Sequence, residues 1–441
     1  MSDGRQPEKM TLPARLGWGH RGFHATSGKR ALLGLLLLLL LPFLSDVIGA
    51  LRFGMQRGYV DLRIWYSIGP AFMSDPRVPL YETYPSYLYP PFFLTLITPL
   101  FKLPANYATA IFQLLKWAAL VVSLRLAWRL CSPRGEDVPP IVALGSLLLA
   151  GRFLANSMTC GNINMFILAA MLTGAWLITR GRQVGAGFVI GVVACIKVMP
   201  ALLLAYFVYK RWWRTLWGAA LAAAVCLLLY PALFLGWENN LRQLQGWWEY
   251  LPQAFLEHGR VNSVHSNQAF AAVLNRLFGG YPAYPPDIYL TPIVWPAWVM
   301  SILRIGGQII GLGVLAYACR RRLDATRESL AYATEIGLVL MATLALSGIS
   351  WKAQFVAVLL PYTAMLAYLV DARYRDRGRR RVIWWLLASF VLCTLTSDII
   401  SPRGADLAEA LGLLLYGALT AGGGLLVLRG MLSERSRVSD G

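Results

Sequence analysis

Apolar residues gather in long segments that are separated by short polar and basic stretches. Twelve such segments recur along the chain, at residues 30–51, 105–130, 138–156, 165–180, 184–197, 199–210, 215–235, 293–318, 331–349, 354–371, 382–400 and 405–428. Most of them are long enough to cross the hydrocarbon core of a bilayer, which takes about 20 helical residues. The pattern predicts an all-α polytopic membrane protein with about 12 transmembrane helices.

Two of these segments, 184–197 and 199–210, are shorter than the rest. At about 1.5 Å per helical residue, neither segment crosses a full bilayer. Arg182 precedes the pair and Lys210 closes it. We expect the two segments to form a hairpin if both of these charges are cytoplasmic.

Composition agrees with the membrane interpretation. Of the 441 residues, 57% are apolar and 14% are charged, whereas ordinary soluble domains contain about 25% charged residues. The chain has 41 Lys and Arg against 22 Asp and Glu, a formal net charge of +19. These cations do not form one basic face, so the charge does not indicate a nucleic-acid partner. A water-soluble globule is excluded.

The cations instead lie in short clusters between apolar segments, such as residues 320–322 and 379–381. Cytoplasmic loops carry this excess of Lys and Arg. We therefore expect a multi-pass protein of the cytoplasmic membrane with a cytoplasmic N-terminal tail (1–29), a membrane domain (30–429) and a cytoplasmic C-terminal tail (430–441). The first apolar segment has no convincing cleavage motif and is expected to be retained.

Two long loops, 52–104 and 236–292, then face outward, while the inner loops are short and basic. Chemistry or recognition is expected on the outer face. Residues 61–73 and 89–103 within the first loop are amphipathic and too short or too interrupted by proline to cross the membrane. We expect them to lie in the membrane interface.

The cysteines and histidines do not indicate a metal or a disulfide framework. Six cysteines are scattered singly, and the four histidines form no HExxH motif. No cofactor motif is present either. The sequence therefore indicates no zinc site and no cofactor, and no acidic cluster argues for a divalent metal.

Asp61 follows the first apolar segment where a surface helix would begin. Aspartate is among the preferred N-cap residues, so a capping role competes with a role as a catalytic base. A polar turn at residues 156–164 has two interpretations as well, a satisfied turn or a substrate-binding element. Lys197 is embedded among apolar residues, which favours a carboxylate or phosphate partner over a snorkelling side chain.

Taken in order, these motifs resemble glycosyltransferase family 87, whose members are polyprenol-phosphate-sugar-dependent enzymes of the C superfamily. The resemblance covers about residues 30–400 and rests on the order and spacing of the motifs. They are Asp61 after Gly58, Tyr89-Pro90-Pro91-Phe92-Phe93, Gly161-Asn162-Ile163-Asn164, Gly185, Gly187 and Gly191 before Lys197 and Pro200, Lys210-Arg211-Trp212-Trp213, Asn267-Gln268 and Ser350-Trp351.

The resemblance implies transfer of a sugar, a mannose-like hexose or arabinofuranose, from a polyprenyl-phosphate carrier to a glycan or glycolipid acceptor on the outer face. The family's first-loop aspartate matches Asp61, which is then the general base. Four cations are expected to stabilise the donor phosphate: Lys197, Lys352, Arg260 and Arg63. Seven residues are expected to bind substrate: Tyr89, Asn162, Asn164, Asn267, Gln268, Trp351 and Gln354.

The chain departs from the family pattern at two places. Where the family commonly has Ser-Trp-x-His-His, this chain has Lys352, Ala353 and Gln354 after Ser350-Trp351, so both imidazoles are missing. The family's GQ.N turn here carries Asn162, a shorter amide. A replacement imidazole from His265 competes with a merely solvated loop histidine.

Further polar groups lie within apolar segments. Arg304 and Gln308 are four residues apart on one face, so we expect them to point into the bundle. They line a lipid-phosphate path or bridge helices. Glu335 is nearer the inner end of its segment, where an interfacial position is expected.

Two rival classes remain open. A lipid or glycan flippase or secondary transporter would also be a polytopic bundle with a buried lysine. Transporters often show two related halves with interrupted helices in matching positions, and the sequence shows no such pairing. An inactive binding member of the family is the other rival, and the retained Asp61 argues against it.

Overall fold

The computed structural model describes residues 25–56, 58–132, 138–256, 261–283, 290–291, 293–374 and 378–440. Every regular element in these ranges is helical, as predicted. The helices that build the bundle are α1 (Ala25–Phe53), α5 (Ala105–Cys131), α6 (Pro140–Cys160), α7 (Asn164–Thr179), α8 (Gln183–Ala194), α9 (Ala201–Tyr209), α10 (Arg214–Ala223), α15 (Ala297–Ala318), α16 (Ser329–Leu346), α17 (Leu359–Val370), α18 (Arg379–Thr394) and α20 (Leu413–Asp440).

Smaller helices fill the two long loops and the chain reversals. They are α2 (Val60–Ser74), α3 (Leu80–Thr83), α4 (Pro91–Ile97), η1 (Thr98–Lys102), η2 (Ala224–Leu229), α11 (Tyr230–Leu235), α12 (Trp237–Trp248), η3 (Glu249–Gln253), α13 (Ala254–Leu256), α14 (Phe270–Phe278), η4 (Lys352–Val358), η5 (Ala372–Tyr374) and α19 (Pro402–Ala410). The predicted amphipathic stretches 61–73 and 89–103 correspond to α2 and to α4 with η1.

Seven helices of the described residues are long and apolar enough to cross a membrane, judged by length and composition. They are α5, α6, the continuous run Arg214–Leu235, α15, α16, the run Lys352–Val370 and α20 as far as Glu434. Helices α7 and α8 are apolar but shorter. The fold class is that of a polytopic helical membrane protein, while the count of twelve spans stays a prediction.

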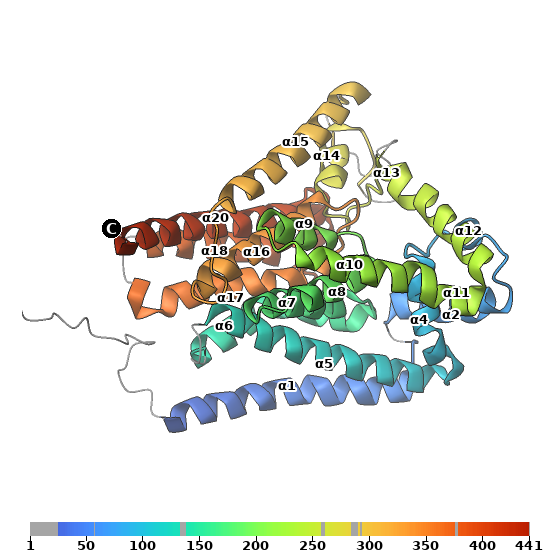
Figure 1. Cartoon of the computed structure of the whole chain (residues 1–441), viewed down its shortest axis with the longest axis horizontal. Coiled ribbons are helices and arrows are strands. Elements are labelled where there is room, and N and C mark those ends of the chain that lie inside the picture. The colour runs from blue at the N-terminus through green and yellow to red at the C-terminus, as the bar shows by residue number, and fades with distance from the viewer. Residues whose placement is uncertain are drawn as a thin grey trace, which may run out of the picture.

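The two long loops lie at the same end of the bundle. Helices α2, α4, α11 and α12 gather at one end in Figure 1, and the C-terminus lies at the opposite end with the beginning of α1. This is the arrangement that the alternation of apolar segments predicts. Elements from residues 60–102 and 230–256 are therefore close enough to form one surface.

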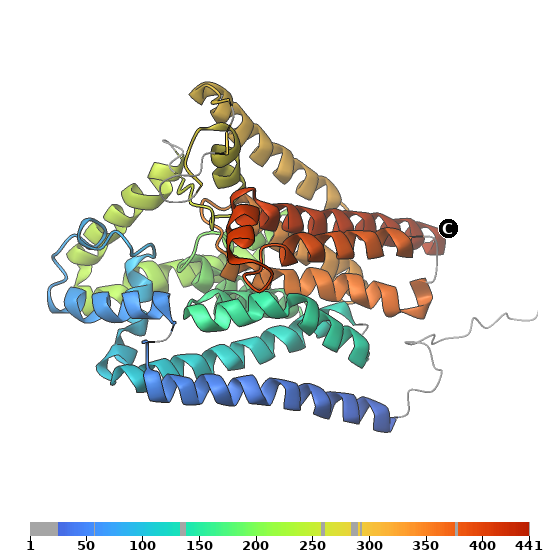
Figure 2. The same cartoon turned by 180° about the vertical axis from the view of Figure 1, so that it is seen from behind.

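The core is formed by α5, α6, α7, α16 and α17, and the edges by α1 and α15. Figure 2 shows α1 and α15 on opposite edges of the molecule. Helix α15 buries none of its residues. Arg304 and Gln308 are consequently half-exposed. Ile302, Ile305 and Ile309 of the same helix are exposed, so the expectation that Arg304 and Gln308 face the bundle stays a prediction.

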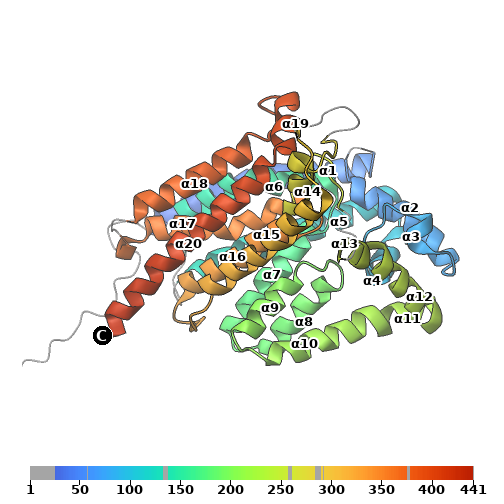
Figure 3. The same cartoon turned by 90° about the horizontal axis from the view of Figure 1, so that it is seen from above.

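The predicted hairpin is present as α8 and α9, which pack beside α10 on one side of the bundle (Figure 3). Glycines allow α8 and α10 to touch backbone to backbone. A Cβ on Gly187 would lie 1.8 Å from the Thr215 carbonyl oxygen, and one on Gly218 would lie 1.9 Å from the Val184 carbonyl oxygen. Small residues permit such close approach between membrane helices.

The last two predicted segments differ from the structure. Helix α18 ends at Thr394 rather than near residue 400. The segment 405–428 is not one helix, because the chain turns at Gly412, whose φ is 87°. Glycine adopts this left-handed conformation without a steric penalty. The turn separates α19 from α20, and α20 continues through most of the predicted C-terminal tail.

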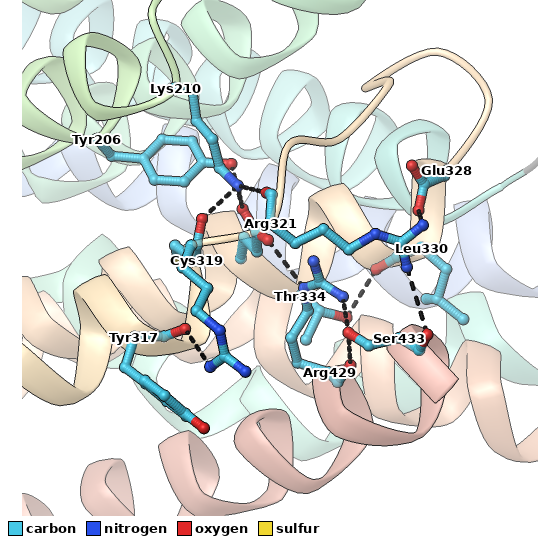
Figure 4. A network of polar contacts seen from close by, with 12 residues as sticks. Tyr206, Lys210, Tyr317, Cys319, Arg321, Glu328, Leu330, Thr334, Arg429 and Ser433 are labelled. Atoms are coloured by element: carbon cyan, nitrogen blue, oxygen red, sulfur yellow. Dashed lines mark hydrogen bonds and ion pairs between the residues drawn. The ribbon is translucent and has the colours of Figure 1, made fainter. Parts of the chain in front are cut away.

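A buried cluster of charges joins three parts of the chain near the end that carries the C-terminus (Figure 4). Glu335 on α16 is fully buried and accepts from Lys210 Nζ at 2.7 Å and from Arg429 Nε at 2.8 Å. The Tyr206 hydroxyl donates to the same carboxylate at 2.8 Å. Two cations and a phenol therefore replace water around Glu335, while its expected position at the membrane interface stays a prediction.

Candidate functional site

Asp61 is the second residue of α2 and is half-buried. The residue before the helix is Tyr59, which makes no side-chain capping bond. Asp61 is therefore not the N-cap residue, although its charge is favourable in the first turn of a helix. Among the described residues, no hydrogen-bond donor lies within 3.5 Å of its carboxylate in suitable geometry and no cation lies within 4.0 Å.

Lys197 lies in the turn between α8 and α9 and is held by two amide oxygens. Its Nζ donates to Asn164 Oδ1 at 3.2 Å. With the Gln354 amide turned so that its nitrogen donates to the Ile349 carbonyl at 3.3 Å, the Gln354 oxygen accepts from Lys197 at 2.7 Å. The structure thus brings together three predicted site residues from the α8–α9 turn, α7 and η4.

These three side chains line one open cavity. Its other lining residues are mostly apolar and come from α7, the α8–α9 turn, α16 and η4: Ile167, Leu168, Met171, Met199, Pro200, Leu340, Thr343, Leu344, Val356 and Ala357. An apolar cavity with a few convergent polar groups is the usual form of a small-molecule site. This cavity presents an ammonium group beside a hydrocarbon-like wall.

Asp61 lies within electrostatic reach of this lysine. Burial raises the pKa of the Asp61 carboxyl above its usual range, and the ammonium groups of Lys197 and Lys116 oppose that rise. Burial lowers the pKa of Lys197 to about 8, which Asp61 opposes. Burial and the Asp61 charge both raise the pKa of Tyr89. Shared electrostatics of this kind is typical of functional sites.

The predicted polar turn is well ordered around Asn162. Asn162 Oδ1 accepts from Ser157 Oγ and from the Asn164 backbone N–H, both at 3.0 Å. Its Nδ2 is buried and has no partner among the described residues. The Asn162 oxygen thus satisfies the turn itself, as one of the two interpretations expects. Asn164 instead binds Lys197 and lines the cavity.

Asn267 and Gln268 are fully buried, and their side chains bind mainly backbone groups. Asn267 Nδ2 donates to the Asn262 and Gly348 carbonyls at 2.7 and 3.1 Å, and its Oδ1 accepts from the Ser350 N–H at 2.8 Å. Gln268 Nε2 donates to the Glu409 carbonyl at 2.7 Å. These amides hydrogen-bond the second long loop to the turn that precedes Trp351. Trp351 itself is half-exposed.

Lys352 forms ion pairs with carboxylates. Its Nζ lies 2.5 Å from Glu409 Oε1 and 3.8 Å from Asp398 Oδ2. His265 Nε2 lies 3.6 Å from Oδ1 of Asp406, which is three residues before Glu409 on α19. Arg63 is exposed on α2, and Arg260 lies outside the described residues. Of the four predicted donor-phosphate cations, Lys197 is therefore the one that lines the cavity among the described residues.

The sequence analysis missed Lys116, Asp398 and Glu409. Lys116 is fully buried on α5. The signal that singled out Lys197, a lysine within an apolar segment, applies equally to Lys116. Asp398 and Glu409 fell within the predicted ends of two spans, so their role depended on the chain reversal around α19. The described residues contain no group of three His, Cys, Asp or Glu side chains placed to hold a metal.

Fold and site together define a helical membrane protein with a cation beside an apolar cavity and a carboxylate nearby. The sequence model of glycosyltransferase family 87 matches residues 87–347, more than half of the chain. The chain belongs to this family. The predicted class, a membrane glycosyltransferase, is confirmed.

Three curated mannosyltransferases are similar to this chain. One from Mycobacterium tuberculosis (strain CDC 1551 / Oshkosh), a polyprenol-phosphate-mannose-dependent alpha-(1-2)-phosphatidylinositol pentamannoside mannosyltransferase, is 24% identical over 74% of this chain and 70% of its own length. The other two are polyprenol-phosphate-mannose-dependent alpha-(1-2)-phosphatidylinositol mannoside mannosyltransferases. The one from Mycobacterium tuberculosis (strain ATCC 25618 / H37Rv) is 25% identical over 77% of this chain and 82% of its own length. The one from Mycolicibacterium smegmatis is 25% identical over 57% of this chain and 51% of its own length. No solved structure matches the chain.

Proposed function

We propose that this glycosyltransferase transfers a mannose-like hexose from a polyprenyl-phosphate carrier to a glycolipid acceptor on the outer face of the cytoplasmic membrane, with Asp61 as general base. The observation that carries the proposal is Lys197, whose ammonium group lies in an apolar-lined cavity within electrostatic reach of Asp61. A phosphate with a long hydrocarbon chain is the ligand that combines a cation with an apolar wall.

The relatives support the nature of the sugar and of its carrier. All three are named as dependent on polyprenol-phosphate-mannose, and their named acceptors are phosphatidylinositol mannosides. Arabinofuranose stays the alternative sugar, and a glycan the alternative acceptor. The outer face is supported by the basic clusters, which lie away from the end that carries α2 and the cavity-side turns.

The chemistry needs a base at the acceptor. As the acceptor hydroxyl oxygen forms a bond to the anomeric carbon, its proton passes to the Asp61 carboxylate. The bond between the anomeric carbon and the phosphate oxygen breaks, and its electron pair stays on the phosphate. A general base contributes about 10²- to 10⁴-fold to such a step. Burial suits Asp61 to this role, because a raised pKa makes its carboxylate a stronger base.

The leaving group needs charge stabilisation more than a proton, because it departs as a phosphate. Lys197 can donate to the departing oxygens, since its two amide partners orient the ammonium group without neutralising it. Electrostatic stabilisation by a fixed cation acts most strongly in a water-poor site. Lys352 is already paired with Glu409, so we assign it to the support of the outer turns.

A transfer assay tests the proposed function. The purified protein in lipid nanodiscs is given polyprenyl-phosphate mannose with a radiolabelled sugar, together with phosphatidylinositol mannoside acceptors. We expect label in the glycolipid and release of polyprenyl phosphate. Movement of intact donor between leaflets of vesicles without transfer would contradict the proposal and support a flippase. Transfer of arabinofuranose but not mannose would overturn the assigned sugar.

A further inference from the structure

The end of α6 is held by a lysine from another helix. The last four carbonyls of any α-helix have no partner within the helix. Lys116 on α5 donates its Nζ to two of these in α6, the carbonyls of Ser157 and of Met158, the latter at 3.2 Å. A fully buried ammonium in a membrane-spanning helix is expensive unless it is partnered in this way.

A third carbonyl of the same helix end binds the segment that carries Asp61. The Thr159 carbonyl accepts from the Tyr59 N–H at 2.9 Å. Gly161, with φ 67°, lies against the same residue, and a Cβ added there would be 2.7 Å from the Tyr59 Cα. Asp61 follows two residues later. The end of α6 therefore connects Lys116 directly to the beginning of α2.

Lys116 also contributes charge. The groups that interact electrostatically with Asp61 are Lys116 from α5, Lys197 from the α8–α9 turn, Tyr89 from the segment before α4 and Cys160 from α6. Both lysines stabilise the ionised carboxylate. Lys116 in turn faces a carboxylate of α1, Asp46, which accepts hydrogen bonds from two other α5 side chains, Gln113 at 3.0 Å and Trp117 at 3.2 Å.

We propose that Lys116 is a positioning residue for the reaction: it fixes the end of α6, and through it the first turn of α2, which carries Asp61. The inference deepens the proposed function and rests on it. A lysine that only completed the end of α6 would support folding without affecting the base. The two roles predict different pH dependences of kcat at acidic pH when Lys116 is replaced.

The charge part is tested with Lys116→Met, Lys116→Arg and Lys102→Met, the last a matched control at an exposed lysine. Because Asp61 acts in its ionised form, activity falls as the pH drops through its pKa. Removing a nearby cation raises that pKa. We expect the acid limb of kcat in Lys116→Met to move to higher pH and kcat to fall about 10- to 100-fold, with the donor KM unchanged. In Lys116→Arg the acid limb of kcat should return to the wild-type pH, and Lys102→Met should have the kcat and acid limb of the wild type.

The positional part is tested with Gly161→Ala, which pushes against Tyr59 and keeps the cation. We expect a lower kcat with an unshifted acid limb. A stable, donor-binding Lys116→Met enzyme with wild-type kcat and acid limb would overturn the inference. If Lys116→Met fails to fold, a folded Gly161→Ala enzyme with wild-type kcat would overturn it instead.

The Asp61→Asn variant separates the two levels of the argument. Near-normal turnover by Asp61→Asn would overturn the proposed function together with this inference. An inactive Asp61→Asn enzyme beside a wild-type-like Lys116→Met enzyme would leave the proposed function standing and remove Lys116 from it.

Discussion

Two charged clusters, called inner and outer after the membrane faces that the sequence predicts for them, combine a carboxylate with cations in different ways. In the inner cluster, the Glu335 carboxylate is fully buried, and Lys210 and Arg429 lie within 2.8 Å of it. In the outer cluster, Asp61 and Lys197 interact electrostatically, yet Lys197 is held by amides and lines an open cavity. The first carboxylate is fully partnered within the protein, and the second is half-buried and interacts electrostatically with the lysine that lines the cavity.

This difference agrees with the proposal that the first cluster is structural and the second takes part in the reaction. A buried carboxylate with two cations at hydrogen-bond distance has no face left for a substrate, and its loss strands two charges in the interior. A cation held by neutral amides keeps its charge for an incoming anion. Charge content alone does not distinguish the two clusters, whereas their partners and access do.

The largest effect is expected where the inner cluster is broken. In Glu335→Gln the amide cannot balance Lys210 and Arg429, and stranding a buried ion-pair partner costs about 3–5 kcal/mol. We expect a clear drop in the thermal unfolding temperature of the purified protein. Glu328→Gln is the control, because its partner Arg321 lies 4.0 Å away in a partly exposed pair. Equal unfolding temperatures for both variants would remove the structural role of Glu335.

The outer cluster should respond in binding rather than stability. Hydrogen bonds to charged groups contribute about 1.5–3 kcal/mol, so we expect Lys197→Met to raise the donor KM about 10- to 100-fold. The unfolding temperature should stay near that of the wild type. Lys102→Met serves as the exposed control. A wild-type donor KM in Lys197→Met would mean that this cation does not bind the phosphate.

The same lysine predicts a dependence on alkaline pH. Lys197 binds phosphate in its protonated form, and its pKa is lowered by burial to about 8. Donor kcat/KM should therefore fall as the pH rises through about 8. In Lys197→Arg the alkaline limb should disappear, because a guanidinium stays charged over this range. An alkaline limb that persists in Lys197→Arg would assign it to another group.

The smallest effect is expected for Lys352, whose charge is already balanced. Because Glu409 lies 2.5 Å and Asp398 3.8 Å from its Nζ, we expect Lys352→Gln to change the donor KM less than tenfold, about 1.4 kcal/mol. Donor titrations of this variant beside Lys197→Met provide the measurement. A larger increase for Lys352→Gln than for Lys197→Met would exchange the roles of the two lysines.

Much of the fold could be predicted because it depends on local apolar runs. The ends of α5 and α7 lie within a few residues of the predicted segments, and the hairpin of α8 and α9 is present. The break before α20 was missed, since a single Gly412 within an apolar run gives little warning of a chain reversal. The position of α15 at the edge of the bundle depends on packing, which its own sequence periodicity does not encode.

The site could be predicted only in part, for a related reason. Lys197 was found because a lone lysine in an apolar stretch stands out, and Asn164 and Gln354 came with the motifs. Their mutual distances, and the pairing of Lys352 with Glu409, join residues that are far apart in sequence. Such pairings follow from tertiary packing, so no local pattern shows whether a cation is already neutralised.

The central claim is that Asp61 is a working base rather than a structural carboxylate. The most direct measurement is single-turnover transfer by Asp61→Asn in nanodiscs, with donor binding and unfolding temperature recorded on the same sample and Asp75→Asn, an exposed aspartate just after α2, as the control. We predict a rate about 10²- to 10⁴-fold below that of wild type, with donor binding and stability retained. A near-normal rate, or a rate lost only together with stability, would contradict the account.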